Sequence, residues 1–273
     1  MIVARVRRRF RVGACALLLA AAATSAAAPA GDACPLQTVY ALTQAALLPA
    51  GDDVPLVAQA CRVWSHDPAV ALAAVAYPLP VAADGDGRTL RLVVAVLDAH
   101  DAAVLAVHEA ELAEDAAFAL SGDGLKLDTA GYVLAPGVRA FGVRVRSAAP
   151  GPSCPDRRAN DELTLYVRQG PALRPVFTSH TDFWSRIEGE PCSWAQGQRL
   201  VTEEAAFTID VGPDSHHGYA DLRVTADVAR IESATGSDQD RTVRRRASRV
   251  LRYDGARYDA DALEHGFFWT QDK

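Results

Sequence analysis

Two stretches decide the fold: RTLRLVVAVLDAHDAAVLAVHEA (residues 88–110) and LKLDTAGYVLAPGVRAFGVRVR (residues 125–146). Every second side chain is apolar across residues 90–96 and again across residues 141–145. Between the apolar runs of the first stretch, the polar residues 98–101 are typical of a turn. This alternation, with turn residues between the runs, predicts antiparallel strands with one buried face.

The same pattern recurs toward the C-terminus, at residues 163–168, 200–209, 222–228 and 242–253. We count about ten such strands, with no repeat of 20–50 residues and no alternation of strands with helices. The sequence therefore predicts a mainly β fold of antiparallel sheets, arranged as a β-sandwich or as an open propeller-like structure.

Residues 34–60 differ from the rest because their apolar residues have near-helical spacing, interrupted at Pro49. Asp52 or Asp53 can cap a second short helix, so we expect an N-terminal helical hairpin that a disulfide pins in place. The run AAPGP (residues 148–152) is the one plausible internal boundary, and a subdivision would fall near residues 148–158. Otherwise residues 31–273 are expected to form a single mainly β domain.

Residues 1–30 have the features of a secretory signal peptide. Five arginines precede an apolar run at residues 14–23, and small residues near Ala30 fit a cleavage site. No other stretch is long enough to span a bilayer, which takes about 20 apolar residues. We therefore expect a periplasmic or secreted protein without a transmembrane segment, and leave open whether it uses the general or the twin-arginine export route.

The charge balance narrows the range of partners. The chain has 28 basic and 34 acidic residues, and residues 1–30 contain five of the basic residues and none of the acidic ones. Residues 31–273 therefore carry 23 basic and 34 acidic residues, a net charge of −11. A chain this acidic is not expected to bind nucleic acid or anionic membranes generally.

Four cysteines follow the predicted signal peptide, and they allow three pairings: Cys34, Cys61, Cys154 and Cys192. We favour Cys34 with Cys61 and Cys154 with Cys192, because each bond closes a local loop in an oxidising compartment. The sequence has no CxxC motif and no histidines at zinc-ligand spacing. It also lacks a hydrolase motif such as GxSxG. We therefore expect no metal, no cofactor and no recognisable catalytic residue.

The stretch HTDFWSRIEGEPCSW (residues 180–194) is predicted to be irregular and is our first candidate for a contact surface. Its aromatic residues Phe183, Trp184 and Trp194 are candidate binding residues, since exposed aromatic side chains anchor interfaces. Its carboxylates favour two interpretations: the paired acids of a glycan-cleaving site, or an acidic loop held by a disulfide. They are Asp182, Glu188 and Glu190.

The second candidate surface is the arginine-rich strand expected at residues 242–253, where Arg244, Arg246 and Arg252 share one face. The neighbouring strand contains Asp221 and Asp227, so cross-strand ion pairs are one interpretation. The other is a patch that binds an anion or an acidic partner.

Three short motifs carry a family resemblance: CRVW (residues 61–64), LAPGVRAFGV (residues 134–143) and RYDGARY (residues 252–258). With them the chain resembles uncharacterised secreted or periplasmic bacterial proteins that end in an RYDGxxY-type strand and turn. The resemblance implies export and transfers no catalytic residues. In the turn itself, Gly255 is expected to supply a positive φ.

These observations predict an exported envelope protein that acts as a non-enzymatic binding or interaction module. Its expected partner is an envelope protein or a cell-wall component. Two alternatives remain: a hydrolase acting on envelope glycan or peptide, and a periplasmic protein inhibitor that inserts the loop at residues 180–194 into a basic enzyme.

Overall fold

The computed structural model describes residues 33–51, 55–80, 87–190, 192, 197–234 and 240–264. The predicted signal peptide, its cleavage site near Ala30, and Trp194 all lie outside these residues. Among the residues described, no helix combines the length and the apolar character needed to cross a membrane.

The described residues form one α-helix, thirteen strands and a short 3-10 helix. In chain order these are α1 (Leu36–Gln44), β1 (Ala58–Val63), β2 (Val70–Pro78), β3 (Thr89–Asp98), β4 (Val104–Ala113), β5 (Leu120–Asp128), β6 (Val133–Ala135), β7 (Val138–Arg139), β8 (Phe141–Ser147), β9 (Arg157–Gln169), β10 (Ala172–Glu188), β11 (Arg199–His216), β12 (Tyr219–Ala234), β13 (Arg241–Leu251) and η1 (Asp261–Glu264). The predicted mainly β fold is confirmed.

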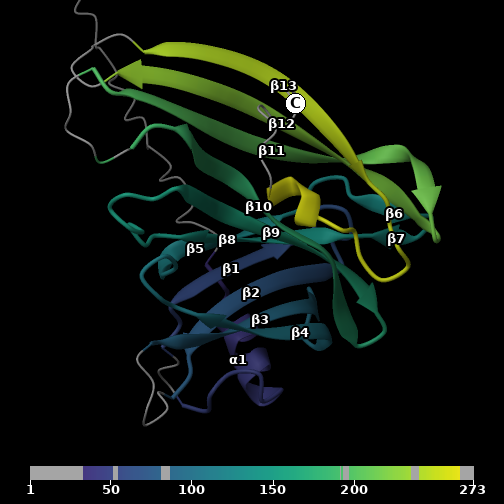
Figure 1. The fold of residues 1–273 in the computed structure, drawn as a ribbon. Helices are drawn as coiled ribbons and strands as arrows, with labels where there is room; N and C mark the ends of the chain where they lie inside the picture. Colours follow the sequence, from purple (N-terminus) through teal and green to yellow (C-terminus); the bar gives the residue numbers. More distant parts are fainter. Residues whose placement is uncertain are drawn as a thin grey trace, which may run out of the picture. The chain divides into compact units, whose positions relative to one another are not determined.

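Eleven strands form one sheet, and eight of them follow the order β1-β2-β3-β4-β10-β11-β12-β13 (Figure 1). The other three form a branch from β10, in which β9 pairs with β10, β8 with β9, and β5 with β8. At its start β10 pairs in parallel with β4, through Ala172 and Val107, and it pairs antiparallel with β9 and β11. The expectation of purely antiparallel sheets is therefore wrong. β4 and β10 are separated by five strands rather than by a hairpin, so no local turn sets their relative direction.

The predicted helical hairpin is also wrong, because α1 is the one α-helix among the described residues. The segment expected to form the second helix enters β1, where Ala58 and Ala60 are buried and alternate with more exposed residues. A run of small residues matches either period, and here burial inside the sheet decides for the strand. The disulfide Cys34–Cys61 attaches the start of α1 to this strand.

The helix explains why β2 and β3 are almost continuously apolar. Leu42 of α1 packs with Val75 and Val93 on one face of these strands. On their opposite face, Leu72 and Val94 belong to a second buried cluster, so both faces lie away from water. Strands buried on both faces lose the alternation of polar and apolar residues.

The second cluster is enclosed by the part of the sheet that β1 to β5, β8 and β9 form. It includes Ala58 of β1, Leu125 of β5 and Tyr166 of β9, and β5 contacts β1. The sheet therefore curves until β5 lies against β1.

A third cluster lies on one side of β9 to β13, and this side is called here the main core face. Leu134 from the β6–β7 hairpin and Tyr258 from the segment after β13 pack over it. That segment turns at Gly255, whose φ of 102° is the positive value that the turn requires. The Tyr258 hydroxyl donates a hydrogen bond of 2.6 Å to the carbonyl of Ala220. This contact holds the C-terminal segment against β12.

Candidate binding surface

The side of β9 to β13 opposite the main core face is called here the outer face, and three sequence-predicted binding residues lie on it: Trp184, Arg244 and Arg246. Strand register places Trp184 of β10 beside Arg158 of β9 and Glu204 of β11. The same row continues through Ala229 of β12 to Arg244 of β13. Trp184 and Arg244 are thus three strands apart, about 14 Å at the usual spacing of about 4.8 Å between strands.

The next row of the outer face is Asn160, Asp182, Ala206, Asp227 and Arg246. Arg246 and Asp227 form a two-point ion pair, with Nε–Oδ1 at 2.7 Å and Nη2–Oδ2 at 3.0 Å. The hydrogen bond from Arg246 holds the pKa of Asp227 below its usual value. A cross-strand ion pair therefore exists at this position, as one of our two interpretations expects. It does not account for Arg244, which faces Ala229 across the strands.

Asp221, the other expected partner of the arginines, is not available to them. Its side chain is buried, and its Oδ1 lies 2.7 Å from Nδ1 of His216. Arg252 is exposed directly after the end of β13.

Phe183 is separated from Trp184, because successive residues of a strand point to opposite faces. It packs against the main core face, with its ring centroid 4.9 Å from that of Phe207. The structure therefore places Trp184 on the same face as Arg244 and Arg246, three strands away, and packs the Phe183 ring on the other side, although Phe183 also borders the hollow around Trp184.

A hollow of about 530 Å³ lies around Trp184 on the outer face. The guanidinium carbon of Arg158 sits 5.1 Å from the centroid of the Trp184 ring, within the range of a cation–π contact. The walls include Arg146 at the end of β8, residues 149–152, and the carboxylates Asp182 and Glu204. Positive and negative side chains, an aromatic ring and a concave surface therefore occur together at this place.

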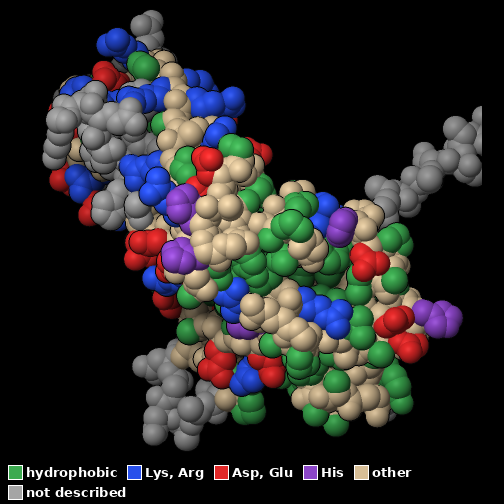
Figure 2. All heavy atoms as spheres, turned by 90° about the vertical axis from the view of Figure 1, so that its right-hand side faces the viewer, with side chains coloured by type: hydrophobic (Ala, Val, Ile, Leu, Met, Phe, Trp, Pro, Cys, Tyr) green, Lys and Arg blue, Asp and Glu red, His purple; other side chains and the backbone are tan. Residues whose placement is uncertain are grey.

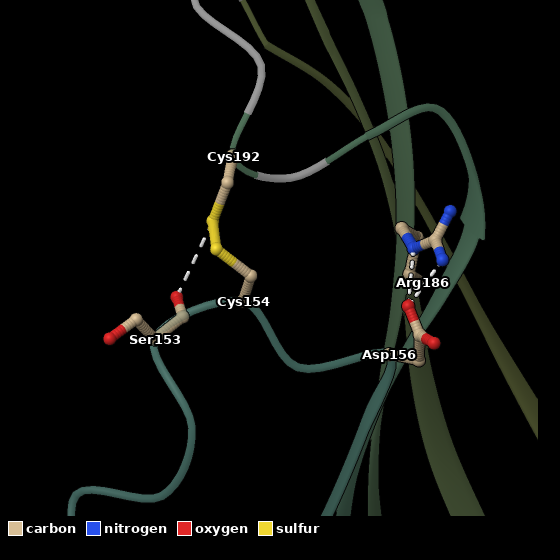
Figure 3. The surroundings of a disulfide bond; sticks show 5 residues. All are labelled: Ser153, Cys154, Asp156, Arg186 and Cys192. Atoms are coloured by element: carbon tan, nitrogen blue, oxygen red, sulfur yellow. Dashed lines mark hydrogen bonds and ion pairs between the residues drawn. A yellow bond between two sulfur atoms is a disulfide. The ribbon is translucent and has the colours of Figure 1, made fainter.

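Figure 3 shows the bonds made by the segment that follows the wall at residues 149–152. Cys154 is bonded to Cys192, which confirms the pairing favoured from the sequence, as does the Cys34–Cys61 bond. Near this bond, Arg186 Nε donates to Asp156 Oδ1 at 2.9 Å, and Arg186 Nη1 donates to the carbonyl of Gly189 at 2.6 Å. The disulfide connects the chain before β9 to the chain after β10, and the bond between Arg186 and Asp156 connects it to the end of β10.

The stretch expected to be irregular is a strand as far as Glu188, because it continues the pairing of β10 with β9 and β11. Asp182 and Glu188 are six residues apart along this strand, about 20 Å at about 3.3 Å per residue. Glu188 pairs with Arg199. Glu190 pairs with Arg186 at 3.5 Å. The three carboxylates therefore do not converge on one site.

Sequence reasoning missed Glu204, which register places diagonally across from Asp182 in the hollow. Side chains in this relation lie about 7–8 Å apart. Both residues are exposed, whereas a general acid among paired carboxylates usually owes its raised pKa to burial. No local motif identifies the pair, since it depends on the register of two strands.

Among the described residues, no group of three or more His, Cys, Asp or Glu side chains is placed to hold a metal ion. Comparison with known proteins found no matching family model, no matching curated protein and no matching solved structure.

Proposed function

We propose that this protein is an exported envelope protein that acts as a binding module, and that the outer face of β9 to β13 is its contact surface. The partner is another envelope protein or a cell-wall component. Nucleic acid is not proposed, because residues 31–273 carry a net charge of −11.

One observation carries the proposal: Trp184 lies in a hollow of about 530 Å³ on the same face as Arg244 and Arg246. Tryptophan and arginine are enriched among the residues that dominate binding energy, and they act best beside a concave surface. The volume is within the range of sites that hold small ligands or single side chains of a partner. A second, more open hollow of about 480 Å³ lies over Asp227, Arg244 and Arg246, so the surface continues to β13.

The charges on this face favour a polar partner over an apolar one. Arg158 and Arg244 alternate with Glu204 along one row, so a complementary surface needs both signs of charge. This mixture is typical of protein and peptide partners.

The compartment is supported by the basic and apolar segments at residues 1–30 and by the two disulfides, which form in oxidising environments. The likeness of RYDGARY (residues 252–258) to the ends of secreted bacterial proteins points in the same direction. The inhibitor alternative loses its main argument, since most of its proposed inserting loop belongs to β10.

Affinity capture tests the proposal, using oxidised protein that begins at Gly31 against envelope extract and insoluble cell wall. The wild type is compared with Trp184→Ala and with Arg244→Glu/Arg246→Glu. Tyr40→Ala is the matched control, because Tyr40 is another aromatic residue, 65% exposed, on α1. We expect one protein or wall fraction that wild type and Tyr40→Ala retain and that at least one outer-face variant loses. Recovery of the same material by all four proteins would overturn the proposed surface.

A further inference from the structure

The edge of the sheet at β13 is the feature that carries a further inference. Among the described residues, β13 pairs with β12 alone and has no neighbour on its other side. In an edge strand, every second residue points its N–H and C=O away from the paired neighbour. The 11 residues of β13 therefore present about five outward N–H groups and as many carbonyls, a template for one more strand.

The backbone of this edge has none of the devices that usually prevent strand addition. Its pairing with β12 runs without a register shift from Arg241 to Leu251, and β13 contains neither proline nor glycine. By contrast, the β9–β10, β10–β11 and β11–β12 pairings all contain a bulge or irregularity. Two β-branched side chains are also open to solvent, Val243 at 41% and Val250 at 56% exposed. The edge is regular enough to accept a partner strand.

Charge decides which partner fits. Residues 241–252 contain six arginines and no acidic residue: Arg241, Arg244, Arg245, Arg246, Arg249 and Arg252. Basic side chains gather at the upper end of the view in Figure 2, at the height where β12 ends and β11 and β13 begin in Figure 1. Two copies of β13 placed edge to edge would set arginines opposite arginines, which is destabilising. The charge that keeps copies of this chain apart favours an acidic strand.

Both faces of β13 carry arginines. Arg244 and Arg246 lie on the outer face, whereas Arg245 and Arg249 lie on the other side, beside Ala247 and Leu251 and opposite the core residues Val228 and Val224 of β12. An added strand therefore meets arginines on both of its faces, so acidic side chains find opposite charges on either side of the sheet.

We propose that the free edge of β13 binds an extended acidic segment of a partner protein by strand addition. The inference rests on the proposed binding role and names the partner's chemistry. It does not require the Trp184 hollow to take part.

The test uses labelled peptides of 11 residues, the length of β13, and fluorescence anisotropy at low ionic strength. The first peptide alternates glutamate with valine. The second alternates glutamate with proline, so it has the same charge and no N–H on every second residue. We expect the glutamate–valine peptide to bind. The glutamate–proline peptide should bind with an affinity at least about tenfold lower, since each lost hydrogen bond weakens binding. Equal binding of both peptides would reduce the edge to a simple anion-binding patch and overturn strand addition.

Variants then locate the binding. Arg244→Glu/Arg246→Glu should lose the glutamate–valine peptide, and Lys126→Glu/Arg168→Glu, with the same change in net charge at two exposed positions outside β13, should keep it. In hydrogen exchange, the peptide should protect amides of Arg241–Leu251 and leave β1, at the other end of the strand order, unchanged. Absent binding, protection elsewhere, or an unaffected double-arginine variant each contradicts the inference.

The same experiment separates the two proposals. Trp184→Ala should bind the peptide like wild type, because Trp184 lies on β10, three strands from the edge. If no peptide binds but envelope capture still depends on Trp184, strand addition fails and the proposed function stands. If the peptide binds at β13 and no envelope partner is captured, the edge is active and the Trp184 surface is not.

Discussion

Removing the Cys154–Cys192 disulfide should destabilise the protein by about 4 kcal/mol. The two residues are 38 apart in the sequence, so the bond closes a loop of 39 residues in the unfolded chain. In the chain-entropy model, a loop of this length corresponds to about 3.9 kcal/mol at 25 °C. The perturbation is the double substitution Cys154→Ala/Cys192→Ala, which removes the bond without leaving a free thiol.

The contacts of the folded state suggest that removing the disulfide changes stability mainly by giving the unfolded chain more conformational freedom. The ends of the β9–β10 hairpin are held together by the pairing of Arg157 with Ser185 and by a 2.8 Å hydrogen bond from the Arg186 N–H to the Asp156 carbonyl. These contacts remain when the disulfide is removed. In native-state hydrogen exchange, the amides of β9 and β10 that are most protected in the wild type should therefore also be the most protected in the variant.

The assay is equilibrium unfolding in urea, with Cys34→Ala/Cys61→Ala as the comparison. That bond has a sequence separation of 27, which corresponds to about 3.6 kcal/mol in the same model. The two variants should thus lose similar amounts, with the larger loss at Cys154–Cys192. A loss below about 1 kcal/mol, or selective loss of protection at the start of β9, would refute the reasoning, because the bond would then act on the folded state or hardly at all.

Two further predictions concern single side chains. The pKa of Glu114 is lowered by its hydrogen bond from Arg88, and Glu114 also accepts from the Leu120 N–H at 2.7 Å. Its folded-state pKa therefore lies below the unfolded value of 4.5, so its stabilisation is present above pH 4.5 and is lost as pH falls through the folded value. Urea unfolding across acidic pH should show this decline, and Glu114→Gln should flatten it. Tyr258→Phe removes the hydroxyl that bonds the Ala220 carbonyl and should cost about 1–2 kcal/mol in the same assay.

Each of these two predictions has a control variant. Glu109→Gln alters another carboxylate that is paired with an arginine, Arg91, but is more exposed, at 40% of its side chain against 9% for Glu114. An identical pH profile for the two variants would contradict the role given to Glu114. Tyr40→Phe changes an exposed hydroxyl, and a cost equal to that of Tyr258→Phe would show that the Ala220 bond contributes nothing.

The sequence by itself determined the mainly β class and many of the strands and turns, and it favoured the disulfide pairing that the structure has. Alternation along residues 242–253 predicted β13, because side chains along a strand repeat every two residues, and the apolar run at residues 90–96 predicted β3, which is buried on both faces rather than on the one expected. The turn at Gly255 followed from local backbone preference. The cysteine pairs followed from short separations. All of these depend on residues near one another in the chain.

Only the tertiary structure decided which strands are neighbours and therefore which side chains share a face. Trp184 and Arg244 are 60 residues apart and meet on one face because β11 and β12 lie between their strands in register. The parallel pairing of β4 with β10 and the replacement of the second helix by β1 also depend on burial against distant strands. Local patterns report backbone conformation and the burial of one face, whereas register and strand order are set by the packing of the whole sheet.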